Sequence, residues 1–146
     1  ACSIIPNPEY KKRQEASLRE AWLMSPNCLS NAAIEACYTY GDEWVDQQSA
    51  YLTENAEFII HYLAGHAPEI KPVKPEGTYL MWLDCRELGM GNEALHDFMI
   101  RKAKLGLNDG CAFGRSLNGY MRLNVACPRS VLEQAMRQLE AAVNSL

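Results

Sequence analysis

The chain has 146 residues, six cysteines and a formal net charge of −4 at neutral pH. This length is sufficient for a hydrophobic core, and the apolar and charged fractions, 48% and 22%, are those of a globular protein. The negative charge, and the lack of a basic cluster longer than Lys11-Lys12-Arg13, argue against a nucleic-acid partner. No apolar run reaches membrane-spanning length, and the first residues lack the layout of a signal peptide.

The cysteines give no indication of a metal centre. They stand at positions 2, 28, 37, 85, 111 and 127, and their spacing forms neither a CxxC pair nor a zinc-ligand set with histidine. This distribution is typical of small buried side chains in a reducing compartment. The sequence therefore predicts a cytoplasmic protein without a metal site.

Two helices are predicted in the first forty residues. Asn7 and Pro8 provide an N-cap and a first helical residue for a polar helix that ends near Trp22. Pro26 interrupts the helical pattern, because the residue before a proline disfavours helical backbone. The second helix, from about Asn27 to Tyr40, carries small apolar side chains, which favour close packing and burial.

The remaining residues alternate between helical and extended patterns. A long helix is predicted from Glu43 to about Ala64, with Asp42 as its cap. The later elements are strands at about 78–83, 105–107 and 120–126 and helices at about 93–104 and 130–144. This order predicts an α/β fold (an α+β small domain) in which a small mixed sheet is covered by helices.

One arginine, Arg122, stands in the middle of the strand predicted from Tyr120 to Ala126. Its guanidinium group offers a rigid fork of donors that matches a carboxylate, so the residue is a candidate anion clamp. The alternative is an ordinary solvent-facing arginine on a half-exposed strand. The pattern alone leaves both interpretations open.

Two motifs resemble a known family. Gly119-Tyr-Met-Arg-Leu-Asn-Val-Ala-Cys-Pro-Arg-Ser130, preceded by Cys111-Ala-Phe-Gly114, resembles the C-terminal signature of class I/II (fold-type I) pyridoxal-phosphate (PLP) aminotransferases. Pro75-Glu-Gly-Thr-Tyr-Leu-Met-Trp-Leu-Asp84 is similar to the branch that includes cystathionine β-lyase-like C–S lyases. The order of the motifs agrees over nearly the whole chain.

The resemblance implies a domain organisation and a partner. Residues 1–42 would be the C-terminal remnant of a large PLP-binding domain, and residues 43–146 the small C-terminal domain, with the long helix joining them. The complete enzyme would be a homodimer that uses PLP and acts on an amino acid, by transamination or by β-elimination.

The resemblance also implies candidate site residues. It assigns to Arg122 the binding of the substrate α-carboxylate. Asn124 shares the strand face of Arg122, and Tyr79 lies at the start of the best-predicted strand, so both are candidates for substrate binding, with a structural role as the alternative. Ser25 and Asn27 align with a loop that lies near the cofactor phosphate in related aminotransferases, although a plain helix-entry turn explains them equally well.

The lysine that carries the cofactor in this family stands in a Ser-x-x-Lys-like motif, upstream of the region that matches this chain. No serine or threonine here is followed three residues later by lysine. We therefore expect no Schiff-base lysine, no cofactor bound by the chain alone and no activity without the rest of the enzyme. The alternatives are a stand-alone module that binds an amino acid through Arg122 without catalysis, and a dimerisation module.

Overall fold

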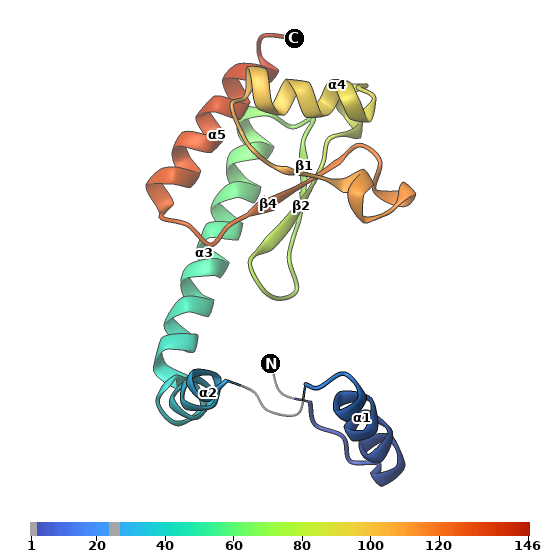
Figure 1. Cartoon of the computed structure of the whole chain (residues 1–146). Coiled ribbons are helices and arrows are strands. Elements are labelled where there is room, and N and C mark those ends of the chain that lie inside the picture. Colours follow the sequence, from blue (N-terminus) through green and yellow to red (C-terminus); the bar gives the residue numbers. More distant parts are fainter. Residues whose placement is uncertain (1–2, 24–26) are drawn as a thin grey trace. The chain divides into compact units, whose positions relative to one another are not determined.

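A computed structural model describes residues 3–23 and 27–146 (Figure 1). The chain divides into two compact units, residues 1–45 and 46–146. The first unit contains helix α1 (Pro8–Glu20) and helix α2 (Cys28–Tyr40), and α3 (Asp42–His66) begins in it. Asn7 caps α1 as predicted, because its side chain accepts hydrogen bonds from the backbone N–H groups of Glu9 and Tyr10.

The prediction that the second helix is buried is wrong for the described chain. Helix α2 has no buried residue, and only Ile34 among its side chains is even half-buried. Small side chains allow another element to approach closely, but they bury a helix only where such an element is present. Large apolar side chains of this unit are exposed as well, among them Trp22, Tyr38 and Tyr40.

The second unit is built on a four-stranded sheet. Its strands are β1 (Lys71–Val73), β2 (Leu80–Asp84), β3 (Asn108–Asp109) and β4 (Tyr120–Asn124), in the order β1-β2-β4-β3. The helices are the second part of α3, α4 (Asn92–Asp97), which continues as a π-helical turn (Phe98–Lys102), and α5 (Arg129–Val143).

The predicted fold class is confirmed. All pairings between these strands are antiparallel, where we expected a mixed sheet, because the neighbouring strands β1–β2 and β3–β4 are joined by returning loops.

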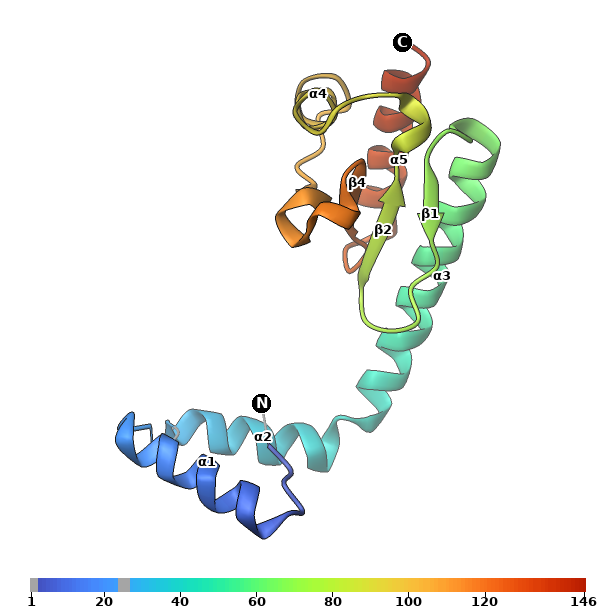
Figure 2. The same ribbon diagram turned by 90° about the vertical axis from the view of Figure 1, so that its right-hand side faces the viewer.

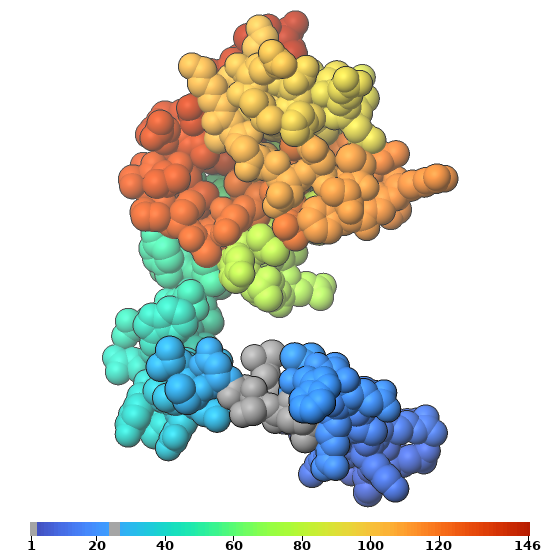
Figure 3. Space-filling model, in the orientation of Figure 1, coloured from blue at the N-terminus to red at the C-terminus, as the bar shows by residue number. Residues whose placement is uncertain are grey.

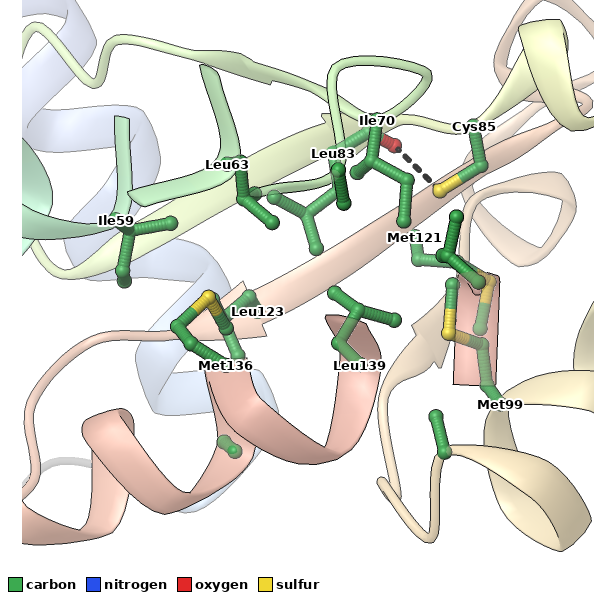
Figure 4. Packing of buried hydrophobic residues seen from close by; sticks show 14 of the residues in the cluster. Ile59, Leu63, Ile70, Leu83, Cys85, Met99, Met121, Leu123, Met136 and Leu139 are labelled. Carbon is green, nitrogen blue, oxygen red and sulfur yellow. Dashed lines mark hydrogen bonds between the residues drawn. The ribbon is translucent and has the colours of Figure 1, made fainter. Parts of the chain in front are cut away.

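Helices α3 and α5 pack on the same face of the sheet (Figures 1 and 2). The strands alternate, so Met81 and Leu83 of β2, with Met121 and Leu123 of β4, turn towards the helices and are buried. Figure 4 shows Leu83, Met121 and Leu123 beside side chains of the helices. The helical side chains in this core include Ile59, Leu63, Met136 and Leu139.

The other side chains of β2 and β4 form what we call the outer face of the sheet. They are Leu80, Trp82, Asp84, Tyr120, Arg122 and Asn124. The loop that follows β3, residues 110–119, is the orange segment in the space-filling view (Figure 3). A Cβ atom at Gly110 would lie 2.3 Å from the carbonyl oxygen of Leu117, so only glycine allows this loop to fold closely onto the start of β4.

Candidate functional site

Arg122 is held in the middle of the outer face. The register places it between Trp82 of β2 and Asn108 of β3, so these three residues form one row across the sheet. Its Nη2 atom donates a hydrogen bond to Asn108 Oδ1 at 3.0 Å. The guanidinium carbon lies 4.3 Å from the centre of the Phe113 ring, and Phe113 in turn meets Trp82 edge to face, with ring centres 5.5 Å apart.

These contacts leave the guanidinium able to bind an anion. Of its five N–H donors, the hydrogen bond to Asn108 engages one, and the Nε–H is buried without a hydrogen-bond partner in the described part of the chain, so the remaining donors on Nη1 and Nη2 are the ones left for a ligand. The ring of Phe113 covers a face of the group, whereas a carboxylate binds in its plane through two parallel hydrogen bonds. The arrangement is therefore compatible with a two-point contact to a carboxylate.

Other arginines in the second unit are already paired with carboxylates. Arg86 forms an ion pair with Asp84 at 2.7 Å, and Arg101 forms one with Asp97 at 3.2 Å. The ion pairs among residues 3–23 and 27–146 do not include Arg122. Arg115, Arg129 and Arg137 are likewise absent from these ion pairs. Arg122 differs from them in its position in the middle of the outer face, where Asn108 and Phe113 contact its guanidinium.

Asp84 occupies the next row of the outer face, opposite Tyr120. Arg86 donates two side-chain hydrogen bonds to it, at 2.9 and 2.7 Å, and the Tyr120 hydroxyl donates another at 3.2 Å. The hydrogen bonds from Arg86 are the main cause that lowers the pKa of Asp84 to about 2. Asp84 is therefore an ionised, paired carboxylate at neutral pH and is not suited to exchanging protons there.

The Asp84 cluster yields a prediction about pH. Because its pKa in the folded protein lies below the ordinary value of 3.8, Asp84 stabilises the fold above about pH 4, and this contribution is lost as the pH falls towards 2. We expect Asp84→Asn to lower the urea midpoint at pH 6 and to have little effect near pH 2. The decrease should be small, since 62% of the Arg86 side chain is exposed and solvent screens the pair.

The matched control is Asp97→Asn, which removes the exposed partner of Arg101. Because this pair is exposed, removing the Asp97 carboxylate should leave the urea midpoint nearly unchanged at both pH values. If Asp84→Asn lowered the urea midpoint by the same amount at pH 6 and near pH 2, the lowered pKa assigned to Asp84 would be wrong.

The structure gives the other predicted site residues different positions. Asn124 lies two residues from Arg122 on the outer face, but its Oδ1 accepts a hydrogen bond from the backbone N–H of Ala126 at 2.8 Å, which is a structural role. Tyr79 lines a groove of about 480 Å³ together with α3 residues such as Leu52 and Ala56, so it lies on the helix side of the sheet. The structure does not bring Tyr79 and Arg122 together.

Of the two candidates for the cofactor phosphate, the structure describes Asn27 only. Asn27 is the N-cap of α2, and its side chain accepts a hydrogen bond from the backbone N–H of Ser30 at 3.0 Å. Ser25 lies outside the described residues.

Asn108 and Phe113 were not among the predicted site residues. The only sequence signal for Phe113 is its place in the Cys111-Ala-Phe-Gly114 motif.

Neither a metal-binding cluster nor a membrane-spanning helix occurs among the described residues. No three histidine, cysteine, aspartate or glutamate side chains there are grouped so that they could hold a metal ion. No described helix combines the length and the apolar character needed to cross a membrane.

Comparisons with known proteins place the chain among longer enzymes. It is 33% identical to cystathionine beta-lyase PatB of Bacillus subtilis, over 97% of this chain and 36% of that protein. It is 35% identical to protein MalY of Escherichia coli, over the whole chain and 38% of MalY. Among solved structures it is similar to cystalysin of Treponema denticola, which contains pyridoxal 5'-phosphate. The TM-score is 0.91 and the identity 34%, over 97% of this chain and 36% of cystalysin.

The chain thus spans somewhat more than a third of the length of these relatives. No protein-family model matches it. The high TM-score shows that the chain has the fold of the matching part of cystalysin. The chain belongs to the class I/II, fold-type I family of PLP-dependent aminotransferases and C–S lyases, and it corresponds to the C-terminal part of enzymes of the cystathionine β-lyase branch.

Proposed function

We propose that this chain supplies the substrate-carboxylate clamp of a PLP-dependent enzyme that acts on amino acids, and that Arg122 is the clamp. The observation that carries the proposal is the environment of the Arg122 guanidinium. It contacts Asn108 and Phe113, no hydrogen bond within the described residues engages its other Nη donors, and no carboxylate of those residues forms an ion pair with it. An amino-acid substrate brings the carboxylate that such a group binds.

The described residues fit the substrate side of a PLP site and not the site of the cofactor itself. PLP requires a lysine, a carboxylate facing its ring nitrogen and a cradle for its phosphate, and it stabilises negative charge at the substrate α-carbon. Lys71 shares the outer face but forms an ion pair with Glu87, and Asp84 is paired with Arg86. We propose that residues outside this chain hold the cofactor and that the chain alone does not catalyse.

Arg122 would then bind and orient the substrate. Two parallel hydrogen bonds to the α-carboxylate fix both the position and the rotation of the amino acid. With the substrate anchored at this end, its α-carbon is held at a defined distance from the outer face, which lowers the entropic cost of reaching the reactive geometry.

Within the family we propose β-elimination at a carbon–sulfur bond, because the names of PatB and cystathionine β-lyase-like relatives describe such lyases. The test is to supply L-cystathionine to the complete protein and to identify the products. Elimination breaks the Cβ–S bond and releases a thiol, and the remaining three-carbon fragment is hydrolysed to pyruvate and ammonia. We expect pyruvate, ammonia and thiol in equal amounts without a second substrate. A sulfur-containing oxo acid that forms only when another oxo acid is added would instead indicate transamination.

The proposal includes a homodimer and a cytoplasmic location. The exposed aromatic side chains of the first unit would become buried in the complete assembly. The cysteines of the described residues are free thiols, which is typical of a reducing compartment. The competing function is a stand-alone module that binds an amino acid or forms a dimer without chemistry, and product formation from L-cystathionine by the complete protein would exclude it.

A further inference from the structure

Phe113 is an aromatic residue outside the hydrophobic core. It ends the 3₁₀ turn Gly110–Phe113, 48% of it is exposed, and it is not a member of the core cluster. Its ring contacts are with two side chains of the outer face, the guanidinium of Arg122 and the ring of Trp82. Phe113 therefore does little for the core, and its contacts centre on the clamp.

The loop that carries Phe113 is fixed by its backbone. Gly110 lies so close to Leu117 and Tyr120 that no side chain fits there. The N–H of Gly114 donates to the carbonyl of Cys111 at 3.3 Å, and the N–H of Leu117 donates to the carbonyl of Gly114 at 3.0 Å. These contacts restrict the conformation of the loop, and the Phe113 ring therefore lies at a defined position beside the outer face.

An arginine side chain is long and has many rotamers, so an isolated one must be ordered when it binds a ligand. Here the ring of Phe113 holds the face of the guanidinium, while Asn108 Oδ1 accepts a hydrogen bond at its edge. The Phe113 ring also contacts the Trp82 ring edge to face. In the free protein the guanidinium is thus in contact with two side chains, at its edge and at the Phe113 ring.

We propose that Phe113 and Asn108 are positioning residues that orient the Arg122 guanidinium before the substrate arrives. This inference rests on the proposed function of Arg122. Neither residue needs to touch the substrate. Phe113 acts through the stacking of its ring on the guanidinium, and Asn108 acts through the hydrogen bond from Nη2.

The first test compares variants of Phe113 in the complete enzyme. Phe113→Leu keeps an apolar side chain but removes the ring, and we expect it to raise KM for the amino acid about 5- to 30-fold while kcat changes little. Phe113→Tyr retains the ring and should behave like the wild type. Asn108→Ala, which removes the hydrogen bond at the edge, should also raise KM.

The chain contains a matched control. The Phe58 ring lies under the guanidinium of Arg129, with 4.6 Å between the ring centre and the guanidinium carbon. Phe58→Leu removes a cation–π contact of the same kind on the helix side of the sheet, and KM should remain at its wild-type value. An equal rise of KM in Phe58→Leu would show that the effect of Phe113 is a general loss of stability.

The second test repeats Phe113→Leu in an Arg122→Ala background. If Phe113 acts through Arg122, the effect of Phe113→Leu on KM disappears when the guanidinium is absent. If Phe113→Leu still raises KM by the same factor, Phe113 acts on the substrate directly or on the fold, and the inference is wrong.

The third test does not depend on activity. The ¹H–¹⁵N NMR signal of Arg122 Nε, identified by its absence in Arg122→Ala, should be sharp and protected from exchange in the wild type, because this atom is buried. The protection should be lost in Phe113→Leu and retained in Phe113→Tyr. Protection that survives Phe113→Leu would overturn the positioning role, even if Arg122→Ala abolishes substrate binding. A normal KM in Arg122→Ala, with protection that depends on Phe113, would refute the proposed function of Arg122 instead.

Discussion

Arg122→Ala should raise KM for the amino-acid substrate at least about 30-fold and leave the absorbance of the bound cofactor intact. Truncating one partner of a hydrogen-bonded charge pair costs about 2–5 kcal/mol of binding free energy, and each 1.4 kcal/mol is a factor of ten. The guanidinium contacts Asn108 and Phe113 on the outer face, and Arg122 is not a member of the core cluster of the described residues, so the fold should survive its removal. Steady-state kinetics with the complete enzyme measure the effect.

Two further variants sharpen the interpretation. Arg122→Lys retains the positive charge but not the planar fork, and KM should fall between those of the wild type and Arg122→Ala. Arg101→Ala removes an exposed arginine that is paired with Asp97, and KM should stay within about a factor of two of the wild type. If Arg122→Ala and Arg101→Ala have the same KM, Arg122 is an ordinary surface arginine.

Asn55→Asp should destabilise the second unit by about 3–5 kcal/mol at pH 7. Asn55 is fully buried, and its Nδ2 atom donates hydrogen bonds to the carbonyls of Val125 at 2.9 Å and Cys127 at 3.1 Å. These bonds join α3 to the segment that leaves β4. A carboxylate in the same place cannot donate when ionised, and it would set a negative charge against two carbonyl oxygens.

The comparison variant is Asn55→Ala, which removes the two donors without adding charge and should cost about 1–3 kcal/mol. Burial raises the pKa of the carboxyl group that Asn55→Asp introduces, so the extra penalty should shrink as the pH is lowered and the group becomes protonated. Urea denaturation at pH 7 and pH 4.5 measures both variants. Equal stability of the two at pH 7 would mean that water reaches this position.

Much of the fold follows from local patterns in the sequence. A run of strand-favouring residues predicted the strand around Met81, alternation predicted the strand around Met121, and capping residues predicted the start of the first helix at Asn7. Strand directions were not predictable in this way. The expectation of a mixed sheet failed because β3 has two residues, Asn108–Asp109, and its pairing depends on the loop that returns to β4.

The site was predictable only in part. Alternation puts Arg122 and Asn124 on one face, as found, but it does not show that Asn124 uses its side chain to cap the end of its own strand. Asn108 lies 14 residues from Arg122 in the sequence and reaches it through the register of β3 against β4. Phe113 reaches Arg122 through the conformation of a loop, the 3₁₀ turn Gly110–Phe113. The burial expected for α2 failed for a similar reason, because burial depends on the neighbouring elements.

The most direct test of the clamp changes the substrate and the protein together. KM would be measured for an L-amino-acid substrate and for its α-carboxamide, with the wild type and with Arg122→Ala. We expect the wild type to bind the carboxylate form at least about 30-fold better than the amide, and Arg122→Ala to bind both forms equally. If Arg122→Ala keeps the full preference for the carboxylate, another group binds the substrate anion and the proposed function of this chain is wrong.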